Sequence, residues 1–154
     1  MKVKIYAVLL LLFVGMQFLQ PTRNKSVSSL NTSIEKHFEV PIDVQNSLSK
    51  ACYDCHSDNT QYPWYAGLQP LAWYLDHHIN EGKKELNFSV FSTYPPQKAA
   101  HKLEEIGEVL TLNEMPLQSY TMLHPLADLS NEEKTKLITW ATELRKLIVA
   151  KHKL

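Results

Sequence analysis

Cysteine occurs at only two positions in this chain of 154 residues, and a histidine directly follows the second one. The stretch reads Cys52-Tyr53-Asp54-Cys55-His56, the spacing at which a c-type haem is attached to protein. Residues three apart share a helix face, so both sulfurs can reach one porphyrin and form thioether bonds to its vinyl groups. His56 can then bind the iron from the proximal side. The motif therefore predicts one covalently attached haem c, held by Cys52, Cys55 and His56.

Other sites also use cysteine pairs at this spacing. A redox dithiol of the thioredoxin type needs a strand–helix–strand context, and the pattern around residue 52 shows none. A zinc site would need a second close pair of ligands, for which the nearest candidates are His77 and His78. A dithiol, a zinc site and a chance match remain alternatives, but the N-terminus favours haem.

The N-terminus has the pattern of an export signal. Lys2 and Lys4 precede an apolar run from Ile5 to Leu19, and residues 16–21 contain no A-x-A-like cleavage site. We therefore expect a signal anchor over residues 1–21 that crosses the cytoplasmic membrane once, with the C-terminal domain in the periplasm. A cleaved signal peptide is the alternative. Either way the domain would lie in an oxidising compartment, where bacteria attach haem to this motif.

Length and charge limit the remaining possibilities. The chain suffices for one folded domain, and its 16 basic and 16 acidic residues give a net charge of zero. A nucleic-acid-binding protein would show a basic excess, so we expect no nucleic acid partner. The predicted division is the anchor over 1–21, a Ser-rich linker over 22–39 and a haem-binding domain over 40–150.

Helical periodicity dominates the rest of the chain. A first helix is predicted from the N-cap Asp43 into the motif, with Val44, Leu48 and Cys55 on one apolar face. A second is predicted over residues 70–82, beginning at a proline and ending at a glycine C-cap.

Two more helices are predicted further along the chain. One starts near Pro96, and the last starts at Ser130, where Glu133 completes a capping box. Apolar residues recur at helical spacing in both: Ala99, Leu103, Ile106 and Leu110, then Leu137, Trp140, Ala141, Leu144, Leu147 and Ile148. The pattern predicts an all-α fold, a cytochrome c-like bundle of about four helices around one haem c, preceded by the signal-anchor helix.

The loop Tyr62-Pro63-Trp64-Tyr65 is unusually aromatic. A porphyrin needs an apolar cover, so we predict that Tyr62 and Trp64 cover a haem face or edge. The alternative is a loop that simply packs on the core.

A methionine is the predicted second iron ligand. Met115-Pro116 lies in a loop before the last helix, where the sulfur can approach the iron from the distal side. The alternative role of Met115 is to fill a gap in the core. His78 is the alternative distal ligand, and the other competitors are His77, His101, Met122 and His124.

The chain resembles the single-haem "haem-binding domain" family of exported bacterial cytochrome c-like proteins. The resemblance runs from about Val40 to Ile148, and its last third is also similar to class I cytochromes c. It rests on the motif at 52–56, Tyr62-Pro63-Trp64-Tyr65, Trp73 through His78 with Gly82, Leu86-Asn87-Phe88, Glu114-Met115-Pro116-Leu117, Tyr120, His124-Pro125, Leu129-Ser130 and Trp140. It implies a covalent haem c and electron transfer, without naming a reaction or a partner.

These observations predict a membrane-tethered periplasmic one-electron carrier that cycles between Fe(III) and Fe(II) and exchanges electrons with redox partner proteins. One alternative is a peroxidase-like enzyme or small-ligand sensor with an open distal site, in which His77 or His78 would act as acid or base. A haem-free thiol oxidoreductase and a haem subunit of a larger membrane complex are the others.

Overall fold

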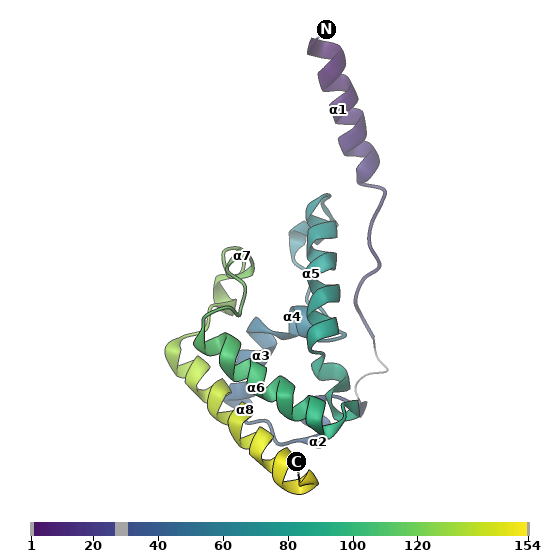
Figure 1. The fold of residues 1–154 in the computed structure, drawn as a ribbon. Coiled ribbons are helices and arrows are strands. Elements are labelled where there is room, and N and C mark those ends of the chain that lie inside the picture. The colour runs from purple at the N-terminus through teal and green to yellow at the C-terminus, as the bar shows by residue number, and fades with distance from the viewer. Residues whose placement is uncertain (1, 27–30, 154) are drawn as a thin grey trace.

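The computed structural model describes residues 2–26 and 31–153, and within them it is helical without a β-strand (Figure 1). This confirms the predicted all-α class. The helices are α1 (Lys2–Met16), α2 (Ile34–His37), α3 (Ile42–Ala51), α4 (Tyr53–His56), α5 (Leu71–Glu85), α6 (Pro96–Thr111), α7 (Gln118–Thr121) and α8 (Asn131–His152), with the 3-10 turns η2 (Trp64–Gly67), η3 (Phe88–Thr93) and η4 (Pro125–Ala127).

Helices α6 and α8 pack side by side and form the base of the domain (Figure 1). Pro96 is the first residue of α6. A backbone N–H at this position would have no partner within the helix, so proline, which lacks the N–H, is well tolerated there. Ser130 caps α8, and its side chain and that of Glu133 form the predicted capping box. Both predicted helix starts are confirmed.

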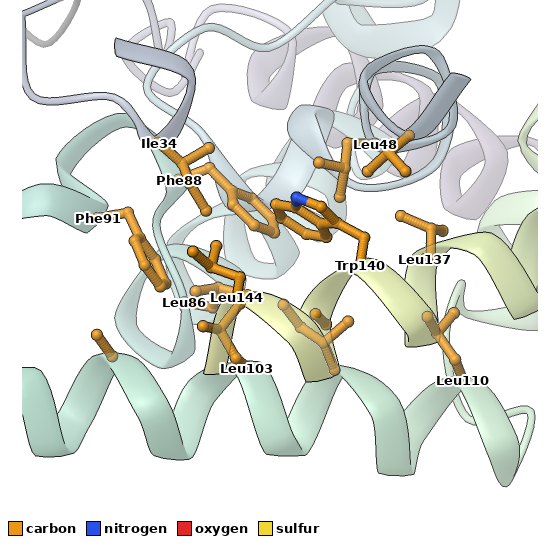
Figure 2. Close-up of a cluster of buried hydrophobic side chains, with 14 of the residues drawn as sticks. Ile34, Leu48, Leu86, Phe88, Phe91, Leu103, Leu110, Leu137, Trp140 and Leu144 are labelled. Atoms are coloured by element: carbon orange, nitrogen blue, oxygen red, sulfur yellow. The ribbon is translucent and has the colours of Figure 1, made fainter. Parts of the chain in front are cut away.

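The main core joins this pair to the segment that leads into the motif. Leu48 of α3, Leu103 of α6 and Leu137 of α8 are each 1% exposed and meet in one cluster (Figure 2). Burial of each such side chain contributes about 1.5–3 kcal/mol. Trp140 of α8 also donates from Nε1 to the Glu39 carbonyl at 3.1 Å. Helix α3 is thereby fixed on α8, and the motif follows directly from α3.

Helix α2 lies within the range 22–39 that the sequence assigns to a linker. Its Ile34 is fully buried in the main core. Phe38, just after it, packs edge-on against Phe91 at 5.9 Å between ring centroids. The division into anchor, linker and domain stays a prediction, with these contacts inside its linker range.

The expected membrane anchor is wrong. Among the described residues no helix has the length and apolar character needed to cross a membrane. Helix α1 has 15 residues, about 22 Å of rise against a hydrocarbon core of about 30 Å. Two residues of the expected span lie beyond the end of α1 and bind the domain: the Gln69 N–H donates to Gln17 Oε1 at 2.9 Å, and Trp73 Nε1 donates to the Leu19 carbonyl at 2.9 Å. The same finding contradicts the expected localisation as a single-pass membrane protein with a periplasmic domain.

Two predicted helix boundaries also differ from the structure. Helix α3 ends at Ala51, and the motif forms its own turn, α4, after a break at Cys52, where φ is −124°. Helix α5 does not end at Gly82 but continues to Glu85. A Cβ atom at Gly82 would lie 2.8 Å from the Cys55 carbonyl oxygen, so this glycine allows α5 to approach α4 closely instead of ending the helix.

Candidate haem-binding site

A cavity of about 360 Å³ lies between the motif helix α4, helix α5 and the segment 115–123. Its volume falls within the range of about 300–1,000 Å³ that is typical of ligand pockets, and its lining is mostly apolar and aromatic. Of the predicted site residues, Cys55, His56, Met115 and the alternative ligand His78 contribute to the lining. Three segments that are distant in sequence thus bring one predicted attachment residue and three predicted iron ligands to one cavity.

His56 is held in the form that an iron ligand needs. Its Nδ1 lies 3.0 Å from the Leu86 carbonyl, which can only accept, so Nδ1–H is the donor and Nε2 keeps its lone pair. Burial is the main cause that lowers the pKa of His56, which favours the neutral imidazole. A hydrogen bond from the far nitrogen is the usual way in which proteins orient a metal-binding histidine.

The two cysteine thiols are free and half-buried, and they face different clusters. Cys52 packs against the main core, whereas Cys55 packs against a small cluster that includes Tyr65 and Ile79. Burial raises the pKa of Cys52 to about 12 and that of Cys55 to about 11, with smaller contributions from the neighbouring acidic groups. Thiol exchange needs the thiolate as the attacking nucleophile, so these raised values disfavour the dithiol alternative.

The two leading candidates for the second ligand lie in different walls of the cavity. Met115 is half-buried in the segment after α6. His78 is in α5, and its ring packs against that of Tyr74, tilted by 38° with 4.2 Å between ring centroids. The Nδ1 atom of His78 is buried and has no hydrogen-bond partner. A buried polar atom without a partner costs free energy, and a bound metal is one of the recognised explanations.

The other competitors for the iron are differently placed. His77 also lines the cavity, on α5. His101 is on the surface of α6, with its Nε2 3.0 Å from Glu105 Oε1. Met122 is 75% exposed, and His124 stacks on Tyr120. None of these last three lines the cavity.

Several apolar side chains of the cavity are exposed to solvent. Leu71, Tyr74 and Leu123 all line it, with exposures of 39%, 53% and 59%. A flat apolar group in the cavity would cover them and gain the free energy of their burial. Together with the unpaired His78 Nδ1, this makes the cavity fit a haem.

Tyr62 and Trp64 do not line the cavity. The Tyr62 hydroxyl accepts from the Asn24 backbone N–H at 2.6 Å, and the Arg23 guanidinium lies over its ring. Trp64 is 90% exposed. Tyr65, the last residue of the same loop, lines the cavity instead and was not singled out from the sequence. The sequence signal for Tyr65 was its place in the aromatic loop beside Tyr62 and Trp64. Residue type alone does not show which ring of a loop points inward.

Two further observations concern groups of metal-binding side chains and a second groove on the domain. Among residues 2–26 and 31–153 no group of three or more His, Cys, Asp or Glu residues is arranged to hold a metal ion. A larger groove of about 1,090 Å³ lies between α8 and residues 37–44, and none of the predicted haem residues lines it.

Comparisons with known proteins agree with the cavity's chemistry. The sequence model of a family described as a haem-binding domain matches residues 11–143. Over 99 residues the chain is 27% identical to "Cytochrome c peroxidase Ccp" of Escherichia coli (strain K12), covering 62% of this chain and 21% of that protein. The chain thus spans about a fifth of the length of this relative. No solved structure matches the present chain. Since the family model covers most of the sequence, the chain belongs to the haem-binding domain family.

Proposed function

We propose that the protein is a one-electron carrier with a single haem c, attached through Cys52 and Cys55 and ligated by His56 and Met115. The observation that carries the proposal is the cavity lined by Cys55, His56 and Met115. When bound, the haem supplies the Fe(III)/Fe(II) couple.

The chain's own residues would bind, orient and shield the group. The Leu86 carbonyl fixes the His56 tautomer, and the apolar lining excludes water, which tunes the potential. Cys52 packs on the main core, so its Sγ must turn toward the cavity for the second thioether bond. Met115 would bind from another wall, and a Met/His pair raises the potential.

A redox titration tests this function. The full chain would be produced with haem c maturation machinery and titrated while its absorbance is followed. We expect one reversible wave with the slope of a single electron, and no sustained consumption of hydrogen peroxide. A wave that is irreversible, or that needs more than one electron, would contradict the proposal.

A peroxidase-like function is the second candidate, because the matched relative is named as a cytochrome c peroxidase. Its activity would require an open distal position and a proton-transferring group, for which His77 and His78 on α5 are the candidates. Sustained peroxide turnover that is lost in His78→Ala or His77→Ala would favour this function over the carrier. A six-coordinate iron without turnover would exclude it.

A further inference from the structure

One wall of the cavity has little apolar anchorage of its own. Helix α7 lies in the segment 115–127 and has no buried residue. Next to it, Met122 and Leu126 are 75% and 84% exposed. Between α7 and the buried Ala127 the backbone hydrogen bonds are local, joining residues 117–128 to one another. The packing of this wall onto the rest of the domain therefore depends on side-chain contacts.

Within the described residues, two side-chain hydrogen bonds tie this segment to the haem motif and its neighbouring loop. Tyr120 Oη donates to Asp54 Oδ2 at 2.6 Å, across 66 positions of the sequence. Tyr65 Oη donates to His124 Nε2 at the longer distance of 3.3 Å. The ring proton of His124 is on Nδ1, which donates to the Tyr120 carbonyl at 3.0 Å, so Nε2 is free to accept from Tyr65. The bond between Tyr120 and Asp54 is the stronger of the two, because it is short and its acceptor is a carboxylate.

Asp54 is itself fixed in place. It lies between the two cysteines of the motif, in helix α4. Its Oδ1 accepts from the Gln61 backbone N–H at 2.8 Å, and its carbonyl accepts from Thr60 Oγ1 at 2.6 Å. Since one carboxylate oxygen is held by the loop, the other is aimed at Tyr120. The motif helix therefore offers a rigid attachment point to the opposite wall of the cavity.

We propose that Asp54 and Tyr120 form a clasp that holds the segment 115–124 closed over the haem cavity. Both are positioning residues: neither would bind iron, but the clasp keeps the part of the segment that follows Met115 over the cavity. The proposal rests on the proposed function, because the clasp controls access to the haem only if a haem occupies the cavity. Burial and the bond to Asp54 raise the pKa of Tyr120, which keeps the phenol a donor.

The size of the effect follows from the type of bond. A hydrogen bond to a charged group shifts an equilibrium between closed and open forms by about ten- to a hundredfold. Tyr120→Phe removes the hydroxyl and keeps the ring that stacks on His124 at 4.1 Å between centroids. We therefore expect this variant to open the segment about ten to a hundred times more often and to leave the main core intact.

The test compares holoprotein variants by amide hydrogen exchange and by ligand binding. The exchange probes are the N–H groups of residues 120–124, which bond only within the segment. The second probe is the rate at which imidazole binds the ferric protein. The matched control is Tyr94→Phe, which removes the acceptor of the Asn87 N–H at 2.9 Å beside η3. Tyr94 does not line the haem cavity.

In Tyr120→Phe, and to a lesser degree in Asp54→Asn, both rates should rise about ten- to a hundredfold, while amides of α6 and α8 keep their protection. The clasp is refuted if exchange at 120–124 rises no more than in Tyr94→Phe, or if it rises equally in α6 and α8. The proposed function is tested separately, by the coordination number of the iron in the wild-type protein. A wild-type iron that is already five-coordinate refutes Met115 ligation, and the exchange comparison still decides whether the clasp exists.

Discussion

His56 shows how a single hydrogen bond can prepare a side chain for iron. The Leu86 carbonyl accepts from Nδ1, so the ring has one orientation and one free nitrogen. The sequence predicts His56 from its place after Cys55, but not Leu86, which is 30 residues away and contributes only a backbone oxygen. Side-chain chemistry can be predicted from a motif, whereas a backbone partner depends on the fold.

The second iron ligand can be identified by one pair of substitutions. In Met115→Ala the proposed pair is broken, so a low-spin six-coordinate absorption spectrum should become high-spin, and the potential should fall. In His78→Ala the spectrum should stay low-spin, because the histidine would only neighbour the haem. The measurement is the absorption spectrum of both variants with wild type. A low-spin Met115→Ala together with a high-spin His78→Ala would transfer the ligand role to His78, whose unpaired Nδ1 offers a reason.

Helix positions depend on a few close contacts, and the contact between α4 and α5 is the one that shapes the cavity. It occurs at Gly82, where a Cβ would be 2.8 Å from the Cys55 carbonyl oxygen and 3.1 Å from the Cys55 Cβ. The partner is mainly backbone, which cannot rotate away. The sequence shows a glycine after a helical pattern, and such a residue predicts a C-cap. Only the packing of α5 on α4 reveals that the helix continues through it.

Gly82→Ala should therefore destabilise the protein by about 1–2 kcal/mol, because overpacking outweighs the small gain in helix propensity. The same change at Gly107 in α6 is the matched control, since its Cβ would be 3.9 Å from the nearest atom, Ile138 Cγ2. That variant should be neutral or more stable by about 0.4–1 kcal/mol. Urea unfolding of both variants measures the difference, and equal stabilities would contradict the role given to Gly82.

Elements whose ends carry local signals were predictable from sequence. The starts of α6 and α8 follow from Pro96 and from the Ser130–Glu133 capping box, each of which acts within one turn. The break at Cys52 was not predictable, because the apolar pattern runs across it without interruption. The exposure of Trp64 was not predictable either, since residue type does not fix the direction of a side chain in a loop.

In the molecule as a whole, the main hydrophobic core and the haem cavity are formed by largely different helices. The main core joins α3, α6 and α8 (Figure 2). The cavity instead lies between α4, α5 and the segment 115–123. Changes in the cavity can therefore alter ligation without unfolding the domain. Long-range links, such as Tyr120 to Asp54 and Leu19 to Trp73, carry no periodic signal in the sequence. The latter link shows that Leu19, a residue assigned to the anchor from the sequence, contacts the domain.

The most direct test of covalent haem in this cavity is the intact mass of the denatured protein after production with haem c maturation machinery, together with a thiol titration. We predict a mass increased by one haem and no reactive thiol, since Cys52 and Cys55 are the chain's only cysteines. Double substitution of both cysteines by alanine should abolish the increase. A protein of unmodified mass with two titratable thiols would contradict the account.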